Sequence, residues 1–538
     1  MLASSQMNAF GSAIALITTI ISGIALMMTW SGSESVSFDR VPMEGDLSPY
    51  DLAQFRHPEP LEVASVEEEG MEEEEEDKPI STEGVSSEMA AAVAAEMAKA
   101  GAPRGNRGKR RQNQTAMAGR QASMDDTKPA MTRTPAVQVD SGGPRNRVLW
   151  ISIAGFRGDY MEKAEAPFLK QMAAEGGSTT SLMPVFPSLH YPCLITQATG
   201  LPVSTHGVAG NVMRDPESKE ILTRPTKLAL LKSEPVWTTA KRQGLTVMVH
   251  DWPFSQEQPA DAAADVFLKT FDDGKTDDVR LSGLLEAWSS YKGPAKIALA
   301  MASLHGLEKA AMANGSRDPK TFEAVTKLDS DLKTFFDKLR DAWPTLGNPG
   351  DKLYVILSTD HGRADAEKVI NFGHLMGPLA EHVEFTVDSG VANIWFKEPP
   401  AGTTLDAYMK KYDEELRARI YWRSYPRGEY PSTLELGSGG PFLGDRLLVL
   451  KGGYAFSEAK GSEPVYSPSE TSGPFSFGGY PVKESSRMKG QAFIFELGGG
   501  GRAADLGQVF PAQLYPTVCN LLGIKGNDGV TAEPLNVN

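Results

Sequence analysis

Histidine and carboxylate side chains follow two apolar runs of the sequence. Asp360 and His361 end the run KLYVILSTDHG, while His305 and Glu308 come directly after AKIALAMAS. His305 and Glu308 are three residues apart and share a face if that segment is helical. Imidazole and carboxylate groups are typical zinc ligands. Together with His190, these side chains are enough donors for one metal ion, provided that the fold makes them converge.

The two cysteines, Cys193 and Cys519, add little to this chemistry. Two thiols cannot build a disulfide framework or a zinc–thiolate site. We expect Cys193 to be a small buried side chain, because apart from His190 nothing basic stands close to it in the sequence. His206, in the segment STHG, is expected to hold a loop by hydrogen bonds rather than to bind a metal.

The charge balance excludes one large class of partners. The 538 residues include 69 acidic and 54 basic side chains, which gives a formal net charge of -15. An acidic chain repels a polyphosphate backbone, so we expect no nucleic-acid partner.

The elements that must position these side chains alternate in type along the chain. VLWISIAGF, LTVMVHDW, AKIALAMAS and KLYVILSTDHG are strand-like, and segments such as LDSDLKTFFDKLRDAW between them are helix-like. This alternation predicts an α/β domain with a largely parallel sheet, flanked by helices. Sites in such sheets gather at the carboxyl ends of the strands. That rule points to Ala154, Asp251, Ser303 and Asp360.

Composition changes divide the chain into segments. An apolar run without a preceding basic residue is long enough to cross a bilayer and predicts an uncleaved signal anchor. A charged stretch that is too polar to pack follows it. We expect a single-pass membrane protein whose main domain is extracytoplasmic, in the periplasm, outside the cell or in a lumen. The segments are a short tail (1–8), the transmembrane anchor (9–30), a disordered charged linker (31–146), the α/β domain (147–530) and a C-terminal tail (531–538).

A set of motifs in this domain resembles a known family. ISIAGFRGDY, MPVFPSLHYPCLITQATGLPVSTHGVAGN, EPVWTTAKRQG, VMVHDWPFS and LSTDHG match the order and spacing of the type I phosphodiesterase or nucleotide pyrophosphatase family, in the alkaline phosphatase superfamily. GDRLLVLKGGYAFS and MKGQAFIFELGGG resemble the family's closing strands, and FPAQLYPTVCNLLGI resembles its final helix. The resemblance covers about residues 147 to 530 and implies an alkaline-phosphatase-like core.

The resemblance also implies a chemistry. Members hold two metal ions, usually zinc, and attack a phosphodiester with a metal-bound threonine at the start of a helix. Paired metals stabilise the attacking and leaving oxygens and lower the pKa of the nucleophile. Six protein ligands are needed, counting the threonine. His190 stands at the threonine position in this sequence, which makes it the candidate catalytic residue.

At other functional positions of the family, this sequence has side chains that can neither bind a metal ion nor stabilise a phosphoryl group in the same way. Ala154 replaces one ligand aspartate, and Ser303 and Leu307 replace a second aspartate and a histidine. Cys193 replaces an asparagine that would stabilise the transferring phosphoryl group. No histidine follows residue 382, so the last ligand is missing, and the matching region lies near Tyr480.

The retained ligands are Asp360 and His361, and His305 and Glu308 are possible replacements for lost ones. Two retained ligands do not hold a catalytic zinc ion, which needs three protein ligands and an open position. We therefore favour a structural interpretation of the Asp-His-Gly segment. In it, Asp360 caps local amides and Gly362 supplies a permissive backbone.

Three functional hypotheses follow. The leading one is a membrane-anchored pseudoenzyme with a binding or scaffolding role and no bound cofactor. The second is an active phosphodiester hydrolase with a rearranged site, in which zinc or another divalent ion is bound by a single set of ligands. The third, compatible with the first, is a subunit of a membrane assembly with protein partners.

Overall fold

The computed structural model describes residues 145–457, 463–483 and 485–536, all within one compact unit of the chain. The predicted anchor and the charged linker up to residue 144 lie outside these ranges. Among the helices of the described ranges, none has both the length and the apolar character that a membrane crossing requires.

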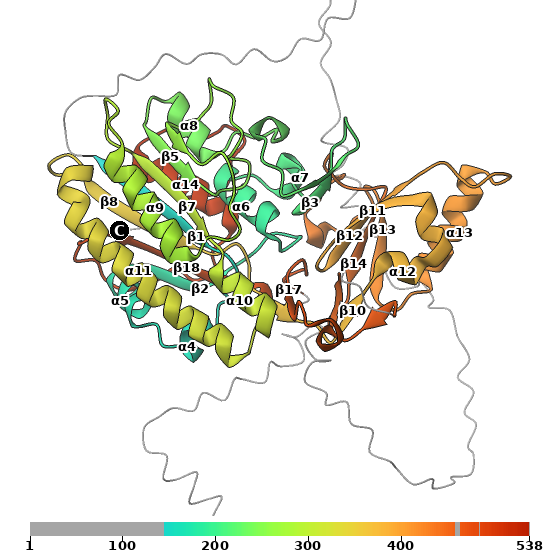
Figure 1. The fold of residues 1–538 in the computed structure, drawn as a ribbon. Coiled ribbons are helices and arrows are strands. Elements are labelled where there is room, and N and C mark those ends of the chain that lie inside the picture. The colour runs from blue at the N-terminus through green and yellow to red at the C-terminus, as the bar shows by residue number, and fades with distance from the viewer. Residues whose placement is uncertain (1–144, 458–462, 484, 537–538) are drawn as a thin grey trace, which may run out of the picture. The chain divides into compact units, whose positions relative to one another are not determined.

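An eight-stranded sheet forms the centre of the fold (Figure 1), in the order β19-β2-β18-β8-β1-β7-β5-β6. The five strands from β8 to β6 are parallel, and β18 is antiparallel to both of its neighbours. The prediction of a largely parallel α/β sheet is therefore confirmed. The strands are β1 (Asn146–Ile153), β2 (Gly177–Leu182), β5 (Val247–His250), β6 (Val266–Phe267), β7 (Leu299–Leu304), β8 (Lys352–Ser358), β18 (Gly490–Glu496) and β19 (Ala504–Asp505).

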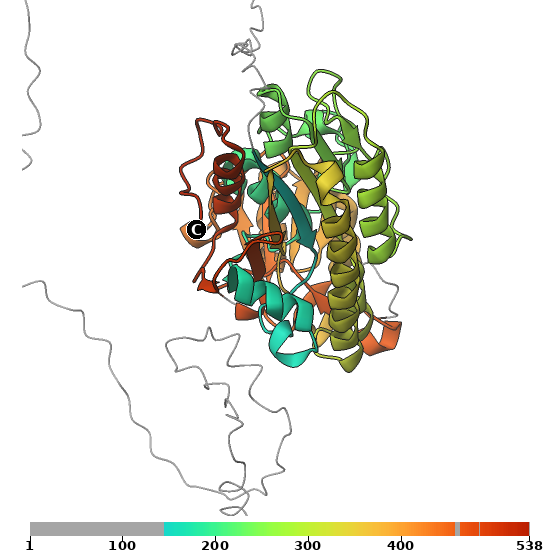
Figure 2. The ribbon, with the colours of Figure 1, turned by 90° about the vertical axis from the view of Figure 1, so that its left-hand side faces the viewer.

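Helices cover both faces of this sheet. Successive side chains of a strand point to opposite faces, and in β1 Val148 and Trp150 pack into one core while Leu149 and Ile151 pack into the other. This two-sided burial explains why VLWISIAGF is apolar throughout rather than alternating. Figure 2 shows the two layers, with α14 in dark red and α11 in yellow on opposite sides of the strands.

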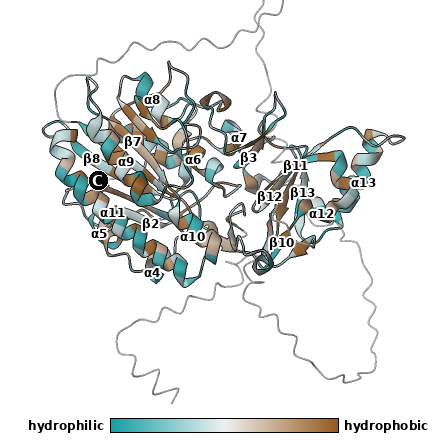
Figure 3. Cartoon of the chain, in the orientation of Figure 1, coloured by the Kyte–Doolittle hydropathy of each residue, from teal (hydrophilic) through white to brown (hydrophobic). Residues whose placement is uncertain are grey.

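The helices fall into two groups by the core that they bury. One core includes side chains of α6 (His190–Thr199), α8 (Val236–Arg242) and α14 (Leu514–Leu522). The other includes side chains of α4 (Tyr160–Lys163), α5 (Pro167–Glu175), α9 (Asp277–Ser290), α10 (Gly306–Asn314) and α11 (Pro319–Leu346). Most of the buried residues of α11 recur at intervals of three or four positions, and Figure 3 colours hydrophilic residues of this helix in teal.

A second, four-stranded antiparallel sheet is built from the chain between β8 and β18, in the order β11-β12-β14-β13. The segment GDRLLVLKGGYAFS, predicted to form closing strands, contributes one strand to this sheet and one to a small three-stranded sheet. The elements are β11 (Val383–Asp388), β12 (Val391–Phe396), β13 (Trp422–Pro426), β14 (Arg446–Leu450), α12 (Phe372–Met376) and α13 (Leu405–Arg417).

Short strands and one short helix complete the fold. The three-stranded sheet has the order β15-β10-β16, and the remaining strands form the pairs β9/β17 and β3/β4. Leu535, in the segment predicted to be a C-terminal tail, is buried against α14. The elements are β3 (Val212–Arg214), β4 (Ile221–Thr223), β9 (Ala364–Asp365), β10 (Lys368–Ile370), β15 (Tyr454–Phe456), β16 (Val465–Tyr466), β17 (Ser476–Phe477) and α7 (Val203–His206).

Candidate functional site

The candidate site lies where β1, β7 and β8 end. These strands are parallel and in register, with Ser152 of β1 opposite Ser303 of β7 and Ser358 of β8. Their carboxyl ends therefore meet at one edge of the sheet, which is the edge predicted from the sequence to contain a site.

Asp360 follows β8 and is the centre of a hydrogen-bond network. Its Oδ1 accepts from the backbone N–H groups of Gly155, at 2.9 Å, and of His361, at 2.6 Å. Its Oδ2 lies 2.7 Å from Nδ1 of His190. Burial alone would raise the pKa of Asp360, but the neighbouring His361 and the hydrogen bond from His190 hold that pKa well below its usual range. Asp360 is therefore an ionised group that caps amides, as the structural interpretation predicted.

Gly362 has a different role from the one expected. A Cβ at this position would lie 1.9 Å from the carbonyl oxygen of Arg487 and 2.6 Å from that of Lys489. Gly362 is not among the residues with positive φ. The glycine therefore permits a close approach of two backbone segments, and conformational freedom is not what the position requires.

His190 is the first residue of α6, and Gln197, about two turns further along, fixes this helix to the end of β8. Gln197 donates to the carbonyl oxygen of Thr359 at 2.7 Å and accepts from Oγ of Ser358 at 3.0 Å. This attachment holds the imidazole of His190 against Asp360, where 11% of the side chain is exposed. An ionised carboxylate can only accept, so Nδ1 of His190 carries the proton between them.

The ring of His361 is oriented by its own backbone neighbour. Nδ1 lies 2.6 Å from the carbonyl oxygen of Gly362, so Nδ1–H donates to it. In the neutral ring, the lone pair is then on Nε2, which lies 3.7 Å from Oδ2 of Asp360. Metal-binding histidines are commonly held in this way through their other ring nitrogen.

Glu308 comes from the first turn of α10 and is paired with an arginine. Nη1 of Arg363 donates to Oε1 of Glu308 at 2.5 Å, and the two side chains are 4% and 12% exposed. Arg363 also donates through Nε to Oγ of Ser476, at 3.0 Å. The negative charge of Glu308 is thus balanced by a buried guanidinium.

Arg363 runs past the loop that follows β1. A Cβ on Gly155 would lie 3.3 Å from Cδ of Arg363 and 3.2 Å from Cα of Glu308, and the φ of Gly155 is +73°. A glycine is required here for both reasons. Arg363 therefore lies beside Gly155, the residue that follows Ala154, where the resemblance expects a ligand aspartate.

The residues do not fit the two metal ions that the resemblance implies. Within the described ranges, the donor atoms of Glu308, Asp360 and His361 form a group, in which all lie within 4.8 Å of one another. Three donors match the ligand count of one zinc ion. However, Glu308 is paired with Arg363, and both oxygens of Asp360 accept hydrogen bonds. The described residues offer no second group of this kind.

The other positions singled out by the resemblance contribute no ligand to this group. Ala154 and Leu307 are buried apolar residues, and Leu307 packs into the core under α10. Burial raises the pKa of the Cys193 thiol well above its usual value. Ser303 is 1% exposed, and the hydroxyl of Tyr480 donates to a backbone carbonyl of β15 at 2.7 Å.

His305 lies beside His190 but outside the group of three donors. The two ring centroids are 5.0 Å apart, and Nε2 of His305 is buried without a hydrogen-bond partner in the described part of the chain. Burial, reinforced by the nearby His190, lowers the pKa of His305 well below its usual value. Both rings line a cavity of about 30 Å³.

His206 holds a loop, as predicted. Its Nε2 lies 2.9 Å from Oγ1 of Thr196, and its Nδ1 accepts from the backbone N–H of Val208 at 3.1 Å. Burial lowers the pKa of His206 to about 3, so the ring is neutral at physiological pH.

Sequence reasoning missed Arg363 and the arginine that balances Asp251. Asp251 follows β5 and pairs with Arg280 of α9, in a contact where the two side chains are 4% and 3% exposed. The position of Arg363 directly after the Asp-His-Gly segment could have indicated its role. Nothing in the sequence indicated the pairing of Arg280 with Asp251, because the two residues are 29 positions apart.

Comparison with known proteins agrees with this architecture. Residues 148–480 match the type I phosphodiesterase / nucleotide pyrophosphatase family. Ectonucleotide pyrophosphatase/phosphodiesterase family member 7 of Homo sapiens is 35% identical over 112 residues, which is 20% of this chain and 24% of that protein. Family member 1 of Homo sapiens is 24% identical over 250 residues, 45% of this chain and 26% of that protein. The chain thus matches about a quarter of the length of these relatives.

Solved structures show the same fold. Murine ectonucleotide pyrophosphatase / phosphodiesterase 5, as an inactive variant in complex with AMP, superposes with a TM-score of 0.60 at 21% identity, covering 73% of this chain and 98% of that one. The human protein of the same name gives a TM-score of 0.58 at 20% identity, covering 73% of this chain and 97% of that one. Because the family match spans more than half of its residues, the chain belongs to the type I phosphodiesterase / nucleotide pyrophosphatase family.

Proposed function

We propose that this chain is a phosphodiesterase-like protein that has lost the two-metal hydrolysis implied by its family and has kept a binding role. One observation carries the proposal: protein groups occupy the anionic donors. Arg363 balances Glu308, and His190 donates to Asp360. With Ala154 and Leu307 at ligand positions, little negative charge is left to stabilise a pair of dications.

The proposal includes an extracytoplasmic position next to a membrane. It is supported by the apolar run at residues 9–30 and by the relatives, which are named as ectonucleotide enzymes. A protein partner in a membrane assembly is compatible with it, and co-purification of the full chain in a mild detergent is the measurement that detects one.

A second candidate is a phosphodiester hydrolase with a single metal ion. It is favoured by the group of Glu308, Asp360 and His361, whose donor atoms lie within 4.8 Å of one another. An ion that displaces Arg363 from Glu308 breaks the ion pair between them. Breaking a buried ion pair costs about 3–5 kcal/mol, which the metal must first offset.

Zinc content and turnover separate the two candidates. The full chain is purified in mild detergent, equilibrated with zinc, desalted and analysed for metal, and its hydrolysis of bis(p-nitrophenyl) phosphate is measured with and without EDTA. We expect less than stoichiometric zinc and no turnover that EDTA abolishes. One zinc per chain together with EDTA-sensitive turnover would refute the proposal and establish the second candidate.

A further inference from the structure

The pairing of His190 with Asp360 leaves one ring nitrogen of His190 chemically available. Because Nδ1–H donates to Oδ2 of Asp360 at 2.7 Å, the lone pair of the neutral ring is on Nε2. A carboxylate in this position fixes the tautomer and the ring orientation, and it stabilises positive charge that develops on the imidazole. The ring is therefore oriented as a nucleophile or a base requires.

Nε2 of His190 has no hydrogen-bond partner among the residues that the structure describes, and His190 lines the cavity of about 30 Å³. The polar atoms Nε2 of His305, Oδ1 of Asp251 and Oε1 of Gln256 are buried there without partners in the same part of the chain. The cavity is thus lined by residues with buried polar atoms that have no hydrogen-bond partner in the described part of the chain.

Two arginines make the surroundings of this cavity attractive to an anion. Arg224 lines it with a half-exposed side chain, and Arg280 lies behind it, with the Phe271 ring between them at 5.6 Å and 4.8 Å from the two guanidinium carbons. Arg280 is balanced by Asp251, whereas the ion pair that Arg224 forms within the described residues is an exposed one with Asp273, at 3.5 Å. An exposed pair of this kind contributes little, so Arg224 is available to an incoming anion.

We propose that His190 is a metal-independent nucleophile toward phosphate esters, and that it forms a covalent phosphoryl–histidine adduct through Nε2. The inference rests on the proposed function, because it assigns the site a chemistry that needs no metal ion. The lone pair of Nε2 forms a bond to phosphorus, and the bond from phosphorus to the leaving oxygen breaks. The leaving group departs with that electron pair, and Asp360 balances the positive charge on the ring through Nδ1–H.

Access to Nε2 depends on Arg224. A cavity of about 30 Å³ holds about one water molecule and is too small for a phosphoryl group. Attack on the ester therefore requires the half-exposed Arg224 side chain, which lines the cavity, to move aside. A good leaving group such as p-nitrophenolate needs no protonation, so it is suited to test the step by itself.

The test is covalent labelling of the full chain by bis(p-nitrophenyl) phosphate in the presence of EDTA. We expect a burst of p-nitrophenolate equimolar with protein, and an acid-labile adduct that peptide mass mapping assigns to His190. His190→Asn, which keeps a donor to Asp360, loses the burst and the adduct entirely. The matched control His374→Ala changes an exposed histidine of α12 and keeps both.

Each outcome bears on one claim. Folded wild-type protein that forms no adduct in EDTA, or a burst that persists in His190→Asn, overturns the inference while leaving the loss of metal chemistry intact. Stoichiometric zinc with EDTA-sensitive turnover overturns the proposed function instead. If His190→Asn does not fold, the adduct mapping on wild-type protein decides alone, because a label on any other residue excludes His190.

Discussion

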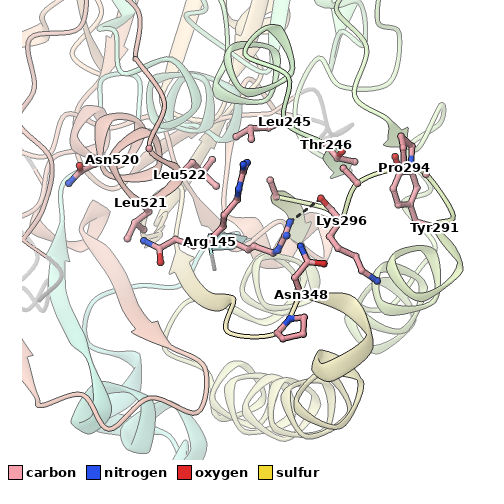
Figure 4. Close-up of a pocket in the computed structure, with 17 residues that line it drawn as sticks. Arg145, Leu245, Thr246, Tyr291, Pro294, Lys296, Asn348, Asn520, Leu521 and Leu522 are labelled. Carbon is pink, nitrogen blue, oxygen red and sulfur yellow. Dashed lines mark hydrogen bonds between the residues drawn. The ribbon is translucent and has the colours of Figure 1, made fainter. Parts of the chain in front are cut away.

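The two edges of the central sheet differ in the size of their cavities and in the surroundings of a buried arginine–carboxylate pair. At the amino edge, a polar cavity of about 1080 Å³ opens between the starts of the strands, and Figure 4 shows Arg145, Tyr291, Lys296, Asn348 and Asn520 around it. At the carboxyl edge, the cavity next to His190 measures only about 30 Å³. Each edge contains a buried arginine–carboxylate pair.

The partners of these two pairs differ. At the amino edge, Asp351 accepts from Nε of Arg147 at 2.5 Å and from the backbone N–H groups of Arg145 and Asn348, at 2.8 Å each. The pair thus ties loops to the start of β1. At the carboxyl edge, Glu308 and Arg363 lie among side chains of metal-ligand type. We conclude that similar buried pairs fasten backbone at one edge and block a donor group at the other.

The largest expected effect is at the amino edge. Asp351→Ala leaves the guanidinium of Arg147 buried without its carboxylate and removes the acceptor of two backbone amides. We expect the free energy of unfolding in urea to fall by about 4 kcal/mol. Zinc should not restore the lost stability, because the described residues of this edge offer no group of metal-binding side chains.

A matched control is Asp337→Ala on the exposed face of α11. Asp337 pairs with Lys333 and Arg340 at the surface, where such pairs contribute little. A loss in Asp351→Ala no larger than in this control would contradict a structural role for the amino-edge pair.

The next largest effect is at the carboxyl edge, where zinc should restore lost stability, unlike at the amino edge. Arg363→Met leaves Glu308 buried and unbalanced, and we expect a loss of about 3 kcal/mol in the free energy of unfolding. The variant also frees Glu308 to join Asp360 and His361 around a metal ion. Zinc at a hundred times its dissociation constant should then restore about 2.7 kcal/mol.

The control for this prediction is the double variant Arg363→Met with Glu308→Gln. It removes both charges, so most of the stability should return while the response to zinc disappears. Should Arg363→Met gain no stability from zinc, the guanidinium is not what keeps a metal out of this group.

The smallest effect is a dependence on pH near the start of α6. Asp388 of β11 is half-buried, and it accepts from the backbone N–H groups of Asn211 and Val212. Burial raises the pKa of Asp388 to about 6. Asp351, by contrast, has a lowered pKa: burial opposes the shift, but the backbone N–H groups and Arg147 outweigh it.

The direction in which stability changes with pH follows from proton binding by Asp388. Between the unfolded pKa of about 4 and the folded pKa of about 6, folded Asp388 holds the proton that the unfolded chain has lost. The stability from this group is full below pH 4 and falls by about 2–3 kcal/mol as the pH rises through 6. Asp388→Asn should remove this decline, measured as the difference from wild type in urea unfolding at pH 4 and pH 7. An unchanged difference between the two pH values would contradict it.

Much of the fold follows from local pattern. The four strand-like runs became β1, β5, β7 and β8, because strands buried on both faces must be apolar at every position. The edge at which the site lies was also predictable from the strand pattern, since parallel strands bring their carboxyl ends together. The second sheet did not follow from pattern, because β14 pairs with β12 and β13, which are distant from it in the chain.

The lack of a metal-binding group at Ala154 and Leu307 is visible in the sequence, since no fold can give Ala154 a carboxylate or Leu307 an imidazole. The neighbours of the remaining donors depend on the folded chain. His190 and Asp360 are 170 residues apart, and Glu308 and Arg363 are 55 apart, so neither contact follows from spacing. These contacts depend on how α6 and α10 pack against the ends of the strands, and buried charge is stable only where packing supplies a partner.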